Sequence, residues 1–436
     1  MTVKLKAISV VWGRSLRAVA GMAIILAAIG CALSSPASAQ VQDQFQILHS
    51  FGSAGDGSGP VGLLVFDQEG NLYGVALGGV DNGGIVYELM PEGNGEWTEA
   101  ILHNFPYNDP NDGYWPTGVV IDGAGNLYGT TSRGGLNDRG TVFELMPGAS
   151  GQWTENILWN FCSLADCADG DGPLTPTLNP AGDLYGVTGT TAFELTPGSG
   201  GWTFNLLYTF CSLPNCTDGS FPIGSLTLDA KGNLYGETLE GGTTDGGTVF
   251  TLQPQPDGQR NEVVLHDFDV LDQAEGYDPS GGVTLHESAL YATTEAGGGS
   301  GCEDAGCGTV FQLTRGSGGV INEQVLHAFS GNGLQGALPN GVVVFDDRGD
   351  LFGVTLGGGN PNDCSGLGCG VVYGMKPQGN GNWAFEVLHT FEESDGFNPV
   401  YGLTLDGKGN LYGTTYGCGS GGGVAFELSP TTQASK

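Results

Sequence analysis

Seven copies of a four-part pattern constrain the fold of this 436-residue chain more than any other feature. The parts are an aliphatic-Leu-ring-x-Phe run, a Gly-Asn-Leu-Tyr-Gly run, a Gly-Thr-Val-Phe-Glu-Leu run and a Pro-x-Gly-x-Leu run. The first part recurs at intervals of 49 to 62 residues, around Leu48, Leu102, Leu158, Leu207, Leu265, Leu326 and Leu388. Such self-similarity indicates a repeat architecture, in which each unit buries its apolar face against its neighbours.

Each repeat contains four short runs rich in Val, Leu, Phe, Tyr and Thr, separated by Gly, Asp, Asn or Pro. This alternation predicts four antiparallel strands, which we name A to D, joined by tight turns. Seven such units predict an all-β, seven-bladed β-propeller; a β-helix or open solenoid would have shorter coils and atypical end units. The predicted blades span residues 56–105, 112–161, 169–210, 218–268, 275–329, 335–391 and 395–430, the last completed by 44–51.

The chain enters its first repeat in the middle of a blade. Phe45–Phe51 has the sequence of a D strand, and Gly423–Leu428 has that of a C strand. We therefore expect the N-terminal strand (45–51) to pair in the last blade, which closes the ring and removes its exposed edges. This register places the D–A and B–C loops on one face of the propeller and the A–B and C–D turns on the other.

The first 39 residues have the composition of a cleaved signal peptide. Four basic residues precede the apolar run Val19–Leu33, and Ala37-Ser38-Ala39 is a small-residue cleavage signature. We expect cleavage after Ala39 and a secreted, periplasmic or cell-surface protein whose residues 40–436 form a single propeller. A lipoprotein site at Cys31 and an uncleaved anchor are the alternatives, although the apolar run is short for a membrane span.

Removing that segment leaves nine basic against 47 acidic residues, a net charge near −38. So acidic a surface repels phosphate, which argues against nucleic acid and anionic membranes as partners. Eight cysteines form local Cys-x4-Cys pairs, which predict four disulfides in an oxidising compartment, with zinc as the alternative: Cys162–Cys167, Cys211–Cys216, Cys302–Cys307 and Cys364–Cys369. Cys418 remains as a free thiol or an intermolecular link.

The repeat motifs resemble a known family. The blocks "GNLYGTT" (125–131) and "GTVFEL" (140–145) are similar to the GloVer (Gloeobacter/Verrucomicrobia-type) tandem repeat of secreted "choice-of-anchor" bacterial proteins. The resemblance covers residues 45 to 430 and implies an exported propeller-like array with no established activity. Members often carry a C-terminal sorting anchor, but only a polar tail follows Pro430 here, so surface attachment is not expected from this feature.

An acidic or amide residue precedes Gly-x-x-Pro in every D–A loop: Asp56, Asp112, Asp169, Asp218, Glu275, Gln335 and Asp395. Because each lies just before the innermost strand, we expect a ring of carboxylates around the axial funnel, with Ca²⁺ as a candidate ligand and no other cofactor. The alternative role is turn capping, in which the carboxylate accepts backbone N–H bonds.

Several residues between that Gly and Pro are aromatic, and we expect them to face the funnel mouth. Aromatic rings beside carboxylates suit stacking on sugars. The candidate ligand-binding residues are Tyr114, Trp115, Phe221, Tyr277, Phe397, Asp112 and Asp395, with packing between blades as the alternative. Arg133 and Arg139 supply rare positive charge nearby.

Histidine placement argues against catalysis in the funnel. Five of the six histidines occupy the repeated Leu-His-x-Phe position of outer strands, and His286 falls in an A–B turn on the opposite face. No Gly-x-Ser-x-Gly, His-Glu-x-x-His or phosphate-binding motif is present, so no catalytic residue is assigned. We predict a monomeric, non-catalytic propeller that binds a glycan or an extracellular partner through its D–A/B–C face. The alternatives are a carbohydrate-active hydrolase or lyase pairing Asp112 with Asp169 or Asp218, and a structural envelope protein.

Overall fold

A computed structural model describes residues 44–430 except 54, 257, 273, 300, 303–304, 331–333, 367 and 418–420. The repeats lie in one compact unit, Val41–Lys436. The predicted signal peptide, its cleavage site after Ala39, Cys31 and Cys418 lie outside the described residues. Within the described residues, no helix is long and apolar enough to cross a membrane.

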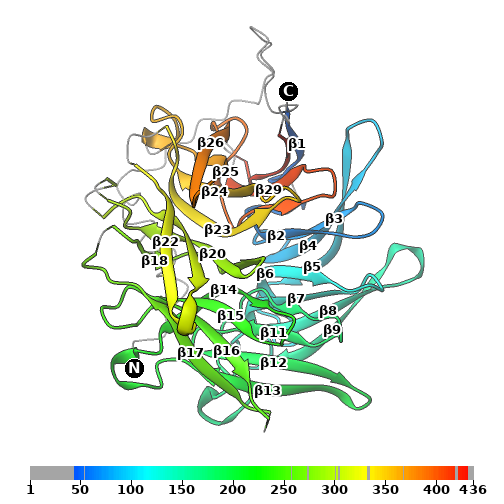
Figure 1. The fold of residues 1–436 in the computed structure, drawn as a ribbon. Coiled ribbons are helices and arrows are strands. Elements are labelled where there is room, and N and C mark those ends of the chain that lie inside the picture. Colours follow the sequence, from blue (N-terminus) through cyan, green and yellow to red (C-terminus); the bar gives the residue numbers. More distant parts are fainter. Residues whose placement is uncertain are drawn as a thin grey trace. The chain divides into compact units, whose positions relative to one another are not determined.

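Seven antiparallel sheets, five of four strands and two in which the A strand is split into two short strands, confirm the predicted β-propeller (Figure 1). In six blades consecutive strands pair in chain order from the A strand to the D strand. Blades one to three contain β2 (Pro60–Phe66), β3 (Leu72–Ala76), β4 (Asn82–Pro91) and β5 (Trp97–Pro106); β6 (Gly113–Ile121), β7 (Leu127–Gly134), β8 (Thr141–Pro147) and β9 (Trp153–Asn160); β10 (Thr177–Leu178), β11 (Leu184–Val187), β12 (Thr191–Gly198) and β13 (Gly201–Thr209).

The next three blades repeat this arrangement, except that the A strand of blade five is split into β18 and β19, which both pair with β20. They contain β14 (Ser220–Leu228), β15 (Leu234–Glu240), β16 (Thr248–Pro254) and β17 (Arg260–Asp267); β18 (Tyr277–Pro279), β19 (Thr284–His286), β20 (Ala289–Ala296), β21 (Thr309–Arg315) and β22 (Ile321–Ala328); β23 (Ala337–Phe345), β24 (Leu351–Gly357), β25 (Val371–Gly379) and β26 (Asn382–Thr390). Single turns of 3-10 helix are η2 (Ala149–Gly151), η3 (Ala165–Cys167), η4 (Pro214–Cys216), η5 (Ser317–Gly319) and η6 (Cys364–Gly366).

The seventh blade joins the two ends of the repeat region. It contains β27 (Phe397–Pro399), β28 (Thr404–Leu405), β29 (Leu411–Gly417), β30 (Val424–Ser429) and β1 (Gln44–Ser50). β1 lies antiparallel beside β30, with pairs running from Gln44↔Ser429 to Ser50↔Val424 (Figure 1). The predicted closure by the N-terminal strand is therefore confirmed.

Aromatic pairs hold each blade to the next. The Phe that ends each Leu-ring-x-Phe run is buried and contacts the C-strand aromatic residue of the following blade, with centroids 4.8 to 5.4 Å apart. The C-strand ring in turn lies over the glycine of Leu-Tyr-Gly. A Cβ at Gly129 would come within 2.4 Å of Phe143 Cζ, which explains why this motif requires glycine.

Threonine hydroxyl groups link the A strands around the axis. Thr227 donates to the carbonyl of Val283 in blade five, and Thr404 donates to that of Leu64 in blade one. Thr175, Thr177 and Thr284 make equivalent links between other adjacent blades. These inter-blade bonds show that the A strands form the innermost ring.

All four predicted disulfides are present, and all four lie in loops of the D–A/B–C face. Cys162–Cys167 and Cys211–Cys216 close D–A loops, whereas Cys302–Cys307 and Cys364–Cys369 close B–C loops. The opposite face carries hairpin turns, in which the first Asp accepts N–H bonds from the turn: Asp122 Oδ1 lies 2.8 Å from Ala124 N and 2.9 Å from Asn126 N. The four disulfides of the D–A/B–C face fit an oxidising compartment.

Candidate functional site

One residue at the start of each innermost strand has a left-handed backbone. It directly precedes the repeated proline, and its φ angle lies between +51° and +62° in all seven blades. We call these seven residues the left-handed ring: Gly59, Trp115, Gly172, Phe221, Asp278, Leu338 and Asn398. Only glycine adopts this conformation without a steric cost.

The backbone of the ring has a structural role that is independent of the side chain. In five blades the ring residue donates its N–H to a carbonyl in the loop that precedes the C strand of the previous blade, as in the 3.0 Å bond from Asp278 to Gly246. The following proline packs on the glycine that precedes that C strand; a Cβ at Gly140 would lie 2.6 Å from Pro173 Cδ. These contacts account for the left-handed turn at five of the seven blade junctions.

The side chains of the ring are not required by that turn. Two blades use glycine, whereas five carry Trp, Phe, Asp, Leu or Asn, at a cost on the order of 1–2 kcal/mol per residue. Trp115 and Asn398 are exposed, and Phe221, Asp278 and Leu338 are half-buried, so solvent reaches all five. Unfavourable backbone conformations tend to persist at functional sites, and this ring is accordingly the candidate site.

Trp115 belongs to an aromatic cluster on blade two. The centroid of its indole lies 5.3 Å from that of the Tyr114 side chain and 6.3 Å from that of Tyr107. The centroids of Tyr107 and Tyr114 are 4.9 Å apart. Tyr114 is buried and donates to Asp138 Oδ1 at 2.8 Å; burial and that bond raise its pKa to about 12. Tyr114 thus supports the cluster, while Tyr107 and Trp115 offer exposed ring surface.

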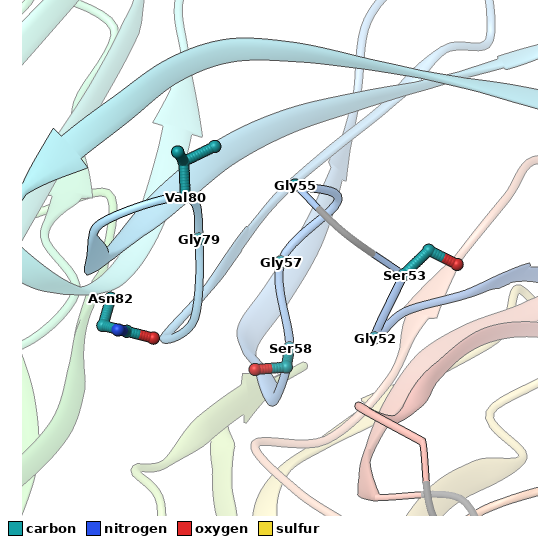
Figure 2. Close-up of a pocket in the computed structure, with 8 residues that line it drawn as sticks. All are labelled: Gly52, Ser53, Gly55, Gly57, Ser58, Gly79, Val80 and Asn82. Carbon is teal, nitrogen blue, oxygen red and sulfur yellow. The ribbon is translucent and has the colours of Figure 1, made fainter.

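A cavity of about 480 Å³ lies on the same face of blade one (Figure 2). It is bounded by the D–A loop that enters blade one and by the B–C loop of that blade: Gly52, Ser53, Gly55, Gly57, Ser58, Gly79, Val80 and Asn82. Asn82 pairs in register with Pro106, the residue before Tyr107. The cavity and the aromatic cluster are therefore neighbours along one loop face.

Exposed apolar side chains concentrate on this face. Among the described residues, twelve large apolar side chains are exposed, and eight of them lie in D–A or B–C loops or at the ring: Val80, Tyr107, Trp115, Leu136, Leu164, Leu213, Leu271 and Leu334. The opposite face contributes Val320. The loop face is thus the more apolar side of a strongly acidic protein.

Two glutamates lie on B strands near the axis; Glu237 is fully buried and Glu295 is half-buried. Glu237 accepts a 2.8 Å bond from Gly282 N in the next blade, and burial raises its pKa to about 8. Glu295 accepts a 3.0 Å bond from Asn340 Nδ2; burial raises its pKa to about 7, and the charge of Asp278 adds to this effect. Neither residue was among the sequence candidates, since neither breaks the repeat: Val or Thr fills the position of Glu237 in the other blades, and Leu, Ser, Gly or Tyr fills that of Glu295.

The carboxylates of the D–A loops were expected around the funnel, and this placement was wrong. Each carboxylate contacts the outer strand of the preceding blade instead. Asp112 Oδ2 and Asp395 Oδ2 lie 3.1 Å from Nε2 of His103 and His389, and Asp169 Oδ2 accepts from Trp159 Nε1 at 3.1 Å. The reason is that each D–A loop leaves the outer strand and runs beside it as far as the glycine of Gly-x-x-Pro. The carboxylate comes before that glycine and therefore lies next to the outer strand. The suggestion of Ca²⁺ at a funnel ring depended on the inner placement.

The remaining sequence candidates divide between the ring and the blade interior. Trp115 and Phe221 belong to the ring. Tyr277 is half-buried and donates to the Ala305 carbonyl at 3.1 Å, and Phe397 packs over Gly417. Tyr107 was missed because it lies before the Gly-x-x-Pro motif, in a loop that no other blade repeats.

These features define the protein as a seven-bladed β-propeller, closed by its N-terminal strand, with a variable ring on one face. The chain belongs to the Gloeobacter/Verrucomicrobia repeat family, whose sequence profile matches residues 37–213 and 188–367. A comparison with curated proteins finds no match.

Solved structures share the fold at low sequence identity. Virginiamycin B lyase from Staphylococcus aureus superposes with a TM-score of 0.54 at 16% identity, covering 89% of this chain and 99% of the lyase. The extracellular domain of the putative hybrid two component system BT4673 from B. thetaiotaomicron gives 0.53 at 13%, covering 90% of this chain and 40% of that one. YCF48 from Cyanidioschyzon merolae gives 0.50 at 13%, covering 88% and 98%. At these identities the likeness concerns the fold alone.

Proposed function

We propose that the protein is an exported binding protein that holds a glycan at the left-handed ring. The observation that carries the proposal is the placement of five side chains where the backbone calls for glycine. A ring that served only to connect blades would be most stable with glycine throughout, as Gly59 and Gly172 are. We infer that the solvent-facing parts of these five side chains contact a ligand.

The chemistry of the ring suits a carbohydrate. Trp115 and Phe221 supply aromatic faces for the C–H surfaces of a sugar, and Asp278 and Asn398 supply groups that hydrogen-bond hydroxyls. A neutral or basic glycan fits best, because 47 acidic residues face 13 basic ones in the chain. Tyr107 and the cavity of blade one extend the same face for a longer oligosaccharide.

A hydrolase or lyase is the second candidate, and Glu295 favours it. Its raised pKa, about 7, is suited to a general acid near neutral pH, and the adjacent Asp278 is a ring residue. The pairing of Asp112 with Asp169 or Asp218 is less suitable, because each of these carboxylates accepts bonds from an outer strand or its loop.

A glycan array followed by titration calorimetry tests the binding proposal with the variant Trp115→Gly. This change relieves the left-handed backbone, so we expect a folded protein of unchanged or higher Tm whose affinity falls at least about tenfold, near 1.4 kcal/mol. Val320→Ser, an exposed change on the opposite face, is the matched control and should bind normally. The proposal fails if no glycan binds or if Trp115→Gly binds as the parent does.

Product analysis by mass spectrometry separates the two candidates. If a bound glycan is cleaved and Glu295→Gln abolishes cleavage while retaining binding, the protein is an enzyme. If the glycan is recovered intact after prolonged incubation, the enzymatic candidate is rejected.

A further inference from the structure

Two clusters of one histidine and two carboxylates lie between the outer strands of adjacent blades. The first contains His49 at the end of β1, Asp56 in the D–A loop and Glu99 on β5. The second repeats it one blade later, with His103 on β5, Asp112 in the next loop and Glu155 on β9. In each cluster one ligand atom per residue lies within 4.8 Å of the other two.

The distances within the clusters match the spacing of metal ligands. His49 Nε2 lies 3.7 Å from both Asp56 Oδ2 and Glu99 Oε2. His103 Nε2 lies 3.1 Å from Asp112 Oδ2 and 3.8 Å from Glu155 Oε1. Ligands at about 2.0–2.2 Å from a tetrahedral zinc ion are themselves about 3.4 Å apart. Small side-chain movements would therefore bring all three atoms of either cluster onto one ion.

Buried polar atoms of these clusters also lack hydrogen-bond partners among the described residues. His49 Nε2, Glu99 Oε1 and Glu155 Oε1 are inaccessible to water and make no hydrogen bond. Such unsatisfied groups call for an explanation, and a bound ion is one of the recognised explanations.

Other blades show that the blade interface does not need the glutamate. The equivalent residues of three interfaces form ring stacks instead: Trp159 on Phe204 at 4.7 Å, His327 on Phe385 at 3.9 Å, and His389 on Phe45 at 3.9 Å. Phenylalanine thus fills the position of Glu99 and Glu155 with good packing. Glutamate fills this position at the other four interfaces, as Glu99, Glu155, Glu262 and Glu323. Among the described residues, only Glu99 and Glu155 lie close enough to a histidine and a second carboxylate to share one ion.

We propose that the clusters His49–Asp56–Glu99 and His103–Asp112–Glu155 each bind one divalent transition-metal ion, with zinc as the probe. One imidazole nitrogen and two carboxylate oxygens suit Zn²⁺ and leave a fourth position for water. Ca²⁺ and Mg²⁺ prefer oxygen ligands alone. The first ion joins the closing strand β1 to blade one, and the second joins blade one to blade two. This assignment is independent of the glycan site.

Calorimetry with Zn²⁺, together with metal analysis after dialysis, tests the proposal on protein without a histidine tag and in a Cys418→Ser background. We expect the parent to bind two zinc ions per chain. Glu99→Phe and Glu155→Phe should each bind one, and the double variant should bind none. Phenylalanine at these positions reproduces the stacks of other blades, so the variants should fold, and Glu99→Gln and Glu155→Gln provide isosteric versions. Zn²⁺ should also raise the Tm of the parent but not that of the double variant.

His327→Ala is the matched control, because His327 occupies the same strand position but stacks on Phe385, and Gln335 fills the loop position of Asp56 and Asp112. It should still bind two ions. Ca²⁺ at the same concentration should neither bind at these clusters nor raise Tm. The proposal is overturned if the parent binds no zinc, or if the double variant binds as much zinc as the parent.

Discussion

The closure of the ring can be tested at a single buried side chain, Phe51. This residue directly follows β1 and is only 3% exposed; its ring lies 4.9 Å from Tyr87 of blade one. Its N–H donates to the Gly423 carbonyl at 2.9 Å, so it joins the closing strand to both the last and the first blade. We expect Phe51→Ala to destabilise the propeller and to release β1 locally.

The magnitude follows from the burial. Truncating a buried Phe to Ala costs about 3–5 kcal/mol, of which part is the cavity that remains. Unfolding entropy is about 2.1 cal/mol/K per residue, so a unit of the size of Val41–Lys436 should lose roughly 4–6 °C of Tm. β1 is a terminal strand, so its detachment also exposes the edge of β30, Val424–Ser429, to proteases.

Phe268→Ala is the control, because Phe268 fills the same repeated position, is fully buried and lies 5.3 Å from Phe311. Both variants should show a similar fall in Tm by scanning calorimetry. Only Phe51→Ala should gain an early cleavage within 423–430 during limited proteolysis at 25 °C. If both variants give the same cleavage pattern, or if Phe51→Ala melts like the parent, β1 does not close the ring as described.

Three further outcomes are expected. Burial raises the pKa of Glu237 in the folded protein to about 8. Between about pH 4.5 and pH 8 the native state therefore keeps a proton that the unfolded state loses. The free energy of unfolding should fall as the pH rises through this range. Urea titrations of Glu237→Gln should show a flatter profile, and identical profiles would refute this assignment. Replacing Cys211 and Cys216 by serine should cost about 2 kcal/mol in denaturant unfolding, given the short loop, and no loss would show that the bridge is not formed. Trp115→Gly should raise stability or leave it unchanged, whereas a loss above about 2 kcal/mol would show that the fold needs the indole.

The sequence predicted those features of the site that recur along the chain. The left-handed ring follows the repeated Gly-x-x-Pro motif, so Trp115 and Phe221 were among the candidates. Tyr107, Glu237 and Glu295 were missed, because each occurs once and their neighbours come from other strands or from the next blade. The role of Asp112 was misplaced for a similar reason: its partner His103 belongs to the preceding blade.

The repeat period alone determined the number of blades, the order of strands and the closing strand, since these depend on local patterns that each unit repeats. The four disulfides followed from the short Cys-x4-Cys spacing, which occurs in only four loops. The tertiary structure alone decided which side of a loop faces the axis and which side chains meet between blades. His103 and Glu155 are 52 positions apart and approach to 3.8 Å only because neighbouring outer strands pack side by side. Contacts of that kind depend on blade twist and packing, which a one-dimensional repeat does not encode.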